Sequence, residues 1–158
     1  MRKWGVIVIA AVCIFIWVAV ETYGSAVEPK RLAQSKALQR AKEEVEFAEI
    51  HDIHAYHGDQ HYITIMGTDK ANNHIIVWVP ENEERVIVKK ANEGITKEDA
   101  ISKLTADRNP KEIISIRLGM ENELPLWEIT YIDRENRYSF YYLSFEDGTF
   151  LRRYSFHQ

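Results

Sequence analysis

Residues 50–80 read IHDIHAYHGDQHYITIMGTDKANNHIIVWVP, a stretch that holds three strand-like runs joined by two turns. The runs span residues 50–57, 61–68 and 74–80 and are rich in β-branched and aromatic residues, which favour strands. Residues 58–60 and 69–73 supply the glycine, aspartate and asparagine that are typical of turns. With a shorter run at 85–88, this stretch predicts an antiparallel sheet of four strands.

The same pattern returns 64 residues further along the chain. Strand-like runs follow at 113–118, 126–132, 138–145 and 150–154, and Asp147-Gly148 is a strong hairpin signal before the last run. This recurrence predicts an internal duplication. Five pairs of residues match under the shift: Ile65 with Ile129, Asp69 with Asp133, Trp78 with Tyr142, Val79 with Leu143, and Ile87 with Leu151.

A predicted helix precedes each predicted sheet. Glu28-Pro29 marks the expected start of the first helix, because proline is tolerated in a first helical turn. Thr96 and Asp99 have the spacing of a capping box for the second helix, which Asn109-Pro110 should end. The predicted fold class is α+β, with an N-terminal transmembrane helix and two tandem units, each a helix packed on an antiparallel sheet. The units are expected at residues 27–92 and 93–158.

The first 26 residues are predicted to form a cytoplasmic tip, a membrane anchor and a short linker. Trp4 to Val20 is an uncharged run of 17 residues, and a helix of that length spans about 25 Å. Arg2 and Lys3 precede it, so the N-terminus should be cytoplasmic and the rest of the chain extracellular, at the cell membrane. A signal peptide cleaved after Ala26 remains an alternative.

Charge and cysteine content limit the partners of the exported part. The whole chain has a formal charge of −4, and without Arg2 and Lys3 it has 18 basic and 24 acidic side chains, a charge of −6. This acidity argues against nucleic acid as a partner. The single cysteine, Cys13, lies in the apolar run, so the exported part cannot form a disulfide.

No pattern in the sequence predicts catalysis or a cofactor. No serine lies in a nucleophile elbow, and the seven glycines are scattered rather than gathered in a phosphate-binding loop. Four histidines lie within residues 51–61, but side chains alternate along a strand and cannot all converge on one metal. Pairing of His57 with His61 across the turn leaves these two as weak metal candidates, and no metal site is predicted.

Aromatic residues are concentrated on the predicted strands. Both faces of the run 138–145 are apolar or aromatic, whereas a sheet covered by one helix needs one buried face. The second face either packs against the other unit or docks a partner protein. The tentative partner-binding residues are Trp78, Tyr138, Phe140 and Tyr142.

The order of several short motifs resembles a known family. The segments Gly67-Thr68-Asp69, Val77–Pro80 and Glu93–Ile95 resemble the TseB-like (YpmB) family of Gram-positive bacteria. Leu126–Tyr131, followed by Tyr138 and Asp147-Gly148, resembles the PepSY-type unit that closes those proteins. The resemblance extends over nearly the whole chain, including the predicted anchor.

This resemblance implies two tandem cystatin-like or PepSY-like units outside the membrane, without enzymatic activity. It further implies a role in cell-wall elongation through contact with a penicillin-binding transpeptidase of the elongation machinery. The alternative function is an extracellular peptidase inhibitor or chaperone of PepSY type. An edge strand such as residues 150–154 could then bind the protease by strand addition.

Overall fold

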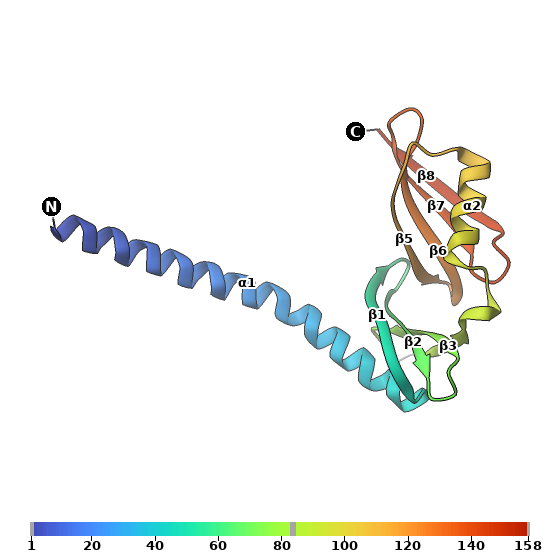
Figure 1. The fold of residues 1–158 in the computed structure, drawn as a ribbon, viewed down its shortest axis with the longest axis horizontal. Helices are drawn as coiled ribbons and strands as arrows, with labels where there is room; N and C mark the ends of the chain where they lie inside the picture. Colours follow the sequence, from blue (N-terminus) through green and yellow to red (C-terminus); the bar gives the residue numbers. More distant parts are fainter. Residues whose placement is uncertain (1, 83–84, 158) are drawn as a thin grey trace. The chain divides into compact units, whose positions relative to one another are not determined.

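The computed structural model describes the backbone of residues 2–82 and 85–157, and the side chains of residues 12–17, 28–82 and 85–157. The fold is α+β, with two antiparallel sheets of four strands in the orders β1-β2-β3-β4 and β5-β6-β7-β8 (Figure 1). In chain order, the elements are α1 (Arg2–Glu44), β1 (Phe47–His57), β2 (His61–Asp69), β3 (His74–Pro80), β4 (Ile87–Lys90), a 3-10 turn (Ala91–Glu93), α2 (Lys97–Arg108), β5 (Glu112–Glu121), β6 (Leu124–Ile132), β7 (Tyr138–Ser144) and β8 (Phe150–Phe156).

The helix α1 corrects one prediction. Pro29 lies inside this helix, so the expected helix start at Glu28-Pro29 and the expected linker before it were wrong. A proline interrupts one backbone hydrogen bond, at a cost of about 3 kcal/mol, and the helix-forming residues on its C-terminal side let the helix continue through it. The last residues of α1 belong to a compact unit of residues 37–158, and residues 1–36 form a separate unit.

The predicted membrane anchor is not confirmed. Over the described part of the chain, no helix is both long enough and apolar enough to cross a bilayer. The predicted run 4–20 lies partly outside the described residues, because the side chains of residues 4–11 and 18–20 are not described.

The first sheet packs against the C-terminal end of α1. Its predicted hairpin register is confirmed, because His57 pairs with His61 and Tyr56 with Tyr62. This register places alternate residues on one face, where they form a core with two small residues of α1 that let the helix approach closely. The buried members of this core are Ala37, Ala41, Ile63, Ile65, Ile75, Val77 and Val79.

The loops between the two central strands of each sheet show the duplication in atomic detail. Asp69 accepts hydrogen bonds from the backbone N–H groups of residues 71 and 73, and Asp133 accepts them from residues 135 and 137. Asn72 and Asn136, again 64 residues apart, both have the left-handed backbone conformation, with φ of 64° and 59°. The two loops therefore have one design, in which an aspartate organises a turn around a left-handed asparagine.

The second sheet carries α2 on one face (Figure 1). The predicted capping box is confirmed, since Thr96 accepts from the Asp99 N–H while Asp99 accepts from the Thr96 N–H. The helix ends at Arg108, and Asn109 takes the left-handed conformation that satisfies its last turn. Ala100 and Leu104 of α2 pack on alternate residues of β6 and β7.

The face of the first sheet that points away from α1 packs against the second half of the chain. Tyr62, Ile76 and Trp78 of the first sheet share one core with Leu118 and Met120 of β5. Trp78 is completely buried there, and its ring lies edge-on to Phe145 at 5.8 Å between centroids. The second apolar face of this sheet is therefore used for packing between the two halves.

Candidate functional site

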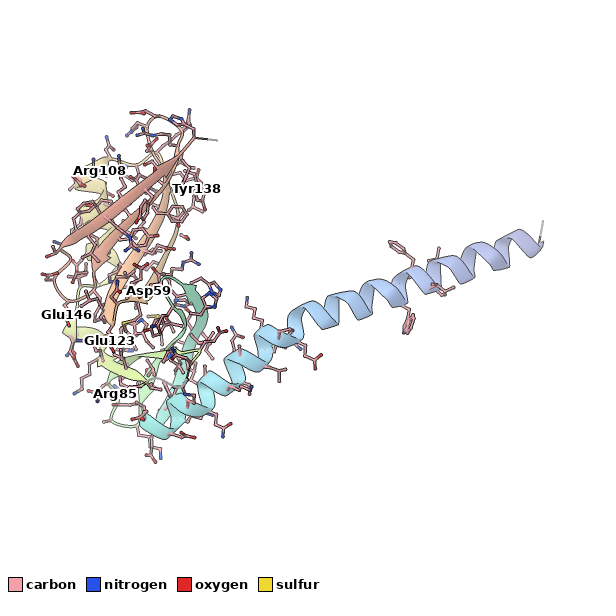
Figure 2. All side chains as sticks on the ribbon, turned by 180° about the vertical axis from the view of Figure 1, so that it is seen from behind. Asp59, Arg85, Arg108, Glu123, Tyr138 and Glu146 are labelled. Carbon is pink, nitrogen blue, oxygen red and sulfur yellow. The ribbon has the colours of Figure 1, made fainter. Side chains whose placement is uncertain are left out.

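The second sheet has a face that α2 does not cover, which we call the open face. It is formed by alternate residues of β6, β7 and β8, because successive side chains on a strand point to opposite sides. Tyr138, on this face, is labelled in Figure 2. The strand pairings place eight side chains on the open face: Arg117, Glu128, Tyr138, Phe140, Tyr142, Arg152, Tyr154 and Phe156.

A buried carboxylate, Glu121, closes one end of the open face. The Tyr56 hydroxyl donates to Glu121 Oε1 at 2.9 Å, and the Arg152 guanidinium forms an ion pair with the same carboxylate. Burial, reinforced by the charge of Glu121, raises the pKa of Tyr56, so its hydroxyl keeps its proton and acts as a donor. The cluster thus joins β1 of the first sheet to β5 and β8 of the second.

A second buried carboxylate, Glu128, has an equivalent set of partners. Arg117 donates to Glu128 Oε1 at 2.7 Å, and the Tyr142 hydroxyl donates to Oε2 at 3.0 Å. Burial raises the pKa of Tyr142, with Glu128 adding to the effect. Each carboxylate is therefore held by one arginine and one tyrosine, an arrangement that fixes the face rather than leaving a reactive group.

Aromatic rings form the exposed part of the open face. Phe140 contacts both Tyr138 and Phe156 edge-on, with ring centroids 5.3 and 6.3 Å away. Tyr154 is 49% exposed and Phe156 is 57% exposed, both high values for large rings. The Arg152 guanidinium lies 4.3 Å from the centre of the Tyr142 ring, a cation–π contact that keeps the long side chain flat on the sheet.

The four tentative partner-binding residues fall into two groups. Tyr138, Phe140 and Tyr142 lie together on the open face, with Tyr138 and Phe140 partly exposed and Tyr142 buried beneath Arg152. Trp78 lies in the core between the two halves, so its assignment as a partner contact needs correction. Its strand has two apolar faces because both are packed, one against α1 and one against β5.

Several residues of the open face were not anticipated from the sequence. Glu128 carried a usable signal, since it is the one charged residue in the apolar strand 124–132. Glu121 and Arg152 carried none, because they are 31 residues apart and meet only when β8 returns beside β7. Tyr154 and Phe156 lie at the end of β8, which extends two residues beyond the predicted strand.

The histidine-rich hairpin does not assemble a metal site in the described part of the chain, where no three His, Cys, Asp or Glu side chains are placed to hold an ion. The rings of His57 and His61 stand edge-on, 4.5 Å apart, and His61 also contacts Glu81 at 3.1 Å. His54 points to the other half of the chain, where its Nε2 bonds to the carbonyl oxygen of Leu118 at 2.9 Å.

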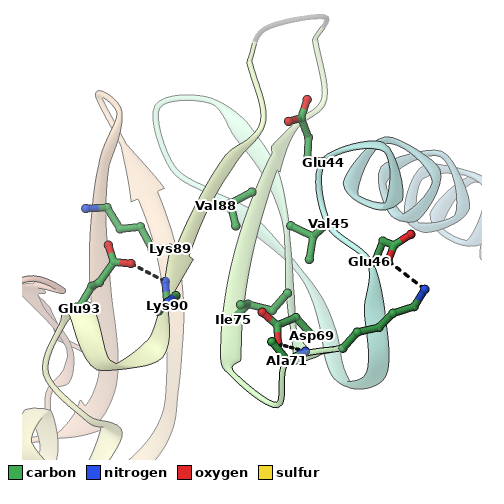
Figure 3. A pocket seen from close by; sticks show the side chains of 11 residues that line it. Glu44, Val45, Glu46, Asp69, Ala71, Ile75, Val88, Lys89, Lys90 and Glu93 are labelled. Carbon is green, nitrogen blue, oxygen red and sulfur yellow. Dashed lines mark hydrogen bonds and ion pairs between the residues drawn. The ribbon is translucent and has the colours of Figure 1, made fainter.

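A shallow groove of about 490 Å³ lies beside the first sheet (Figure 3). Val45, Ile75 and Val88 contribute its apolar lining. Its charged residues already have partners within the chain, since Lys70 pairs with Glu46 at 2.9 Å and Lys89 pairs with Glu146 at 2.6 Å. The open face therefore offers the larger set of exposed aromatic side chains.

Two known domain families match the two halves of the chain. "Cell wall elongation regulator TseB-like domain" matches residues 36–80, and "Peptidase propeptide and YPEB domain", or PepSY, matches residues 94–154. "Probable cell wall elongation regulator TseB" of Bacillus subtilis (strain 168) is 32% identical over 137 residues, which are 85% of this chain and 84% of that protein. The chain belongs to the TseB-like family.

A solved structure of this family has the same fold. The YpmB protein from Bacillus subtilis superposes with a TM-score of 0.73 at 29% identity, over 77% of this chain and 96% of that one. The resemblance to TseB-like and PepSY proteins is thereby confirmed, as is an α+β fold with two antiparallel four-stranded sheets. The open face lies in the part of the chain that matches PepSY.

Proposed function

We propose that this TseB-like chain is a membrane-tethered, extracellular regulator of cell-wall elongation that acts by binding a penicillin-binding transpeptidase. The general role follows from the relationship to the probable regulator TseB. Both matching family descriptions name a regulator or a propeptide, and neither names a catalyst. The contact with a transpeptidase and the membrane tether are our own proposals.

The observation that carries the proposal is the open face. Tyr and Arg are enriched at energetically important interface positions, and here they are held rigid by Glu121 and Glu128. A rigid aromatic surface loses little conformational entropy on binding. Tyr154 and Phe156 are the exposed anchors that a partner would cover.

A membrane tether would complete this mechanism. The uncharged run Trp4–Val20 supports it, because confinement of two proteins to one membrane raises their effective concentration. A weak contact through the open face would then suffice for regulation. Release of the chain by cleavage near Ala26 would remove this advantage.

Site-specific photocrosslinking in a Gram-positive host tests the proposal. A crosslinking amino acid at Tyr154 should capture a penicillin-binding transpeptidase, whereas the same amino acid at the exposed Lys97 of α2 should not. Alanine at an interface anchor costs about 2 kcal/mol or more, so Phe156→Ala should weaken the complex about 30-fold. Capture of the transpeptidase from both positions, or from neither, would refute the proposed contact.

The PepSY match favours a second candidate, inhibition or escort of an extracellular peptidase. This candidate predicts that the purified chain slows a protease secreted by the same organism. It also predicts that the crosslinker at Tyr154 captures that protease instead of a transpeptidase. Unchanged hydrolysis by each secreted protease at saturating chain concentration would eliminate it.

A further inference from the structure

The two edge strands of the second sheet have different surroundings. The edge of β5 is covered by the first half of the chain, where the Leu118 carbonyl accepts hydrogen bonds from His54 Nε2 at 2.9 Å and from Thr64 Oγ1 at 3.3 Å. The Asn122 N–H on the same side donates to Asp59 at 2.8 Å. The opposite edge strand, β8, has no strand beyond it in the described part of the chain.

β8 lacks most of the features that protect natural edge strands from pairing. It has seven residues, no proline and no acidic residue, and its large side chains are exposed. A register shift between Tyr142 and Leu143 places an irregularity near Leu151. The stretch Arg152–Phe156 beyond that point is regularly paired with β7, so its outward N–H and C=O groups form a short template for another strand.

The charges of β8 indicate which strand would fit. Arg152 is already paired with Glu121, but Arg153 points to the opposite face and has no ion-pair partner among the described residues. A second copy of β8 paired in antiparallel fashion would bring two Arg153 side chains together, which is unfavourable. An acidic side chain opposite Arg153 would instead be favourable. Apolar side chains beside Tyr154 and Phe156 would extend the aromatic surface of the open face.

We propose that β8 binds an extended segment of a partner protein as a fifth strand of the second sheet. The segment carries an acidic residue opposite Arg153 and apolar residues on the side of Tyr154 and Phe156. Backbone hydrogen bonds along the edge supply affinity, and the alternate side chains supply specificity. The assignment of that segment to a transpeptidase rests on the proposed function, whereas the strand addition itself does not.

Two labelled peptides test the charge rule on the full chain in detergent micelles. The capped peptide TVTVEVTVT presents glutamate on one face and valine on the other, and TVTVKVTVT differs only in its central charge. Fluorescence anisotropy should show about tenfold tighter binding of the glutamate peptide, because an opposite-charge pair replaces a like-charge pair. Arg153→Glu should reverse the preference, and the control Lys70→Glu, in the β2–β3 loop, should preserve it. Equal binding of both peptides, or an unchanged preference in Arg153→Glu, would overturn the proposal.

Hydrogen exchange of the unaltered chain gives a second test that needs no variant. The glutamate peptide should slow exchange of alternate amides in residues 152–156 by about tenfold or more, as expected for new backbone hydrogen bonds. Protection confined to β1 or β4 would overturn the proposal. Peptide binding without any crosslinked transpeptidase would refute the proposed function alone, and a crosslinked transpeptidase without peptide binding would refute the strand addition alone.

Discussion

The contact between Gly119 and Tyr56 decides how the two halves of the chain fit together. A Cβ at Gly119 would lie 2.5 Å from Cδ2 of the Tyr56 ring and closer still to Cε2 and Cζ. Carbon atoms in favourable contact are about 3.5–4.0 Å apart. A methyl group at this position must therefore displace the ring by about 1 Å, so we predict that Gly119→Ala destabilises the fold.

The magnitude follows from what holds the ring in place. Tyr56 is 1% exposed, packs against Leu126 and Tyr142, and donates to Glu121. Overpacking costs about 1–3 kcal/mol, and loss of a hydrogen bond to a buried charged group costs about 1.5–3 kcal/mol. The reduced entropy of the unfolded chain returns about 0.4–1 kcal/mol. Gly119→Ala should therefore lower the free energy of unfolding by about 2–4 kcal/mol.

Urea unfolding followed by tryptophan fluorescence measures this effect, because Trp78 and Trp127 both lie in the core shared by the two halves. Ser115→Ala, an exposed change in the same strand, is the control and should alter stability by less than about 0.5 kcal/mol. In a Tyr56→Ala background the clash is gone, and Gly119→Ala should then be nearly neutral. An equal cost of Gly119→Ala in both backgrounds would refute the reasoning.

Three further predictions concern single interactions. Thr96→Ala removes one half of the α2 capping box and should cost about 1 kcal/mol in urea unfolding, whereas no loss would mean that the cap adds nothing. Tyr142→Phe leaves Glu128 without its hydroxyl donor and should cost about 1–3 kcal/mol, and a neutral result would show that Arg117 alone satisfies the carboxylate. Hydrogen bonds from Thr149 lower the pKa of Asp147 to about 2 from 3.8, so this carboxylate stabilises the fold above about pH 4 and the contribution is lost as the pH falls toward 2. Asp147→Asn should accordingly flatten the decline of the melting temperature between pH 4 and pH 2, and parallel melting curves would contradict this.

Local signals predicted much of the secondary structure. The turn at residues 58–60 and the two-residue period of the flanking strands were enough to place His57 opposite His61, because a slip by one residue would turn every apolar side chain outward. Thr96 and Asp99 located the start of α2, since a capping box involves residues only three apart. These features depend on neighbours in the sequence, and they were predicted correctly.

Features that depend on distant contacts were not predictable in this way. The apolar faces of a strand do not reveal what covers them, so Trp78 was equally compatible with the core and with a partner surface. Pro29 could mark a helix start or lie within a longer helix, because both positions look alike over a few residues. The ion pair of Glu121 with Arg152 needs two strands that are not neighbours in the sequence.

The duplication provides a further reason to regard the open face as an interface. Under the 64-residue shift, Ile76 corresponds to Phe140 and Trp78 to Tyr142, and all four lie on sheet faces turned away from the helix of their own half. In the first half this face is covered by the second half, with Ile76 and Trp78 fully buried. No third unit follows in this chain to cover the equivalent face of the second half, and its aromatic residues remain partly exposed. Duplicated units tend to bury equivalent faces against a neighbour. A face that packs a sister unit in one copy is thus suited, by shape and composition, to bind another protein in the other.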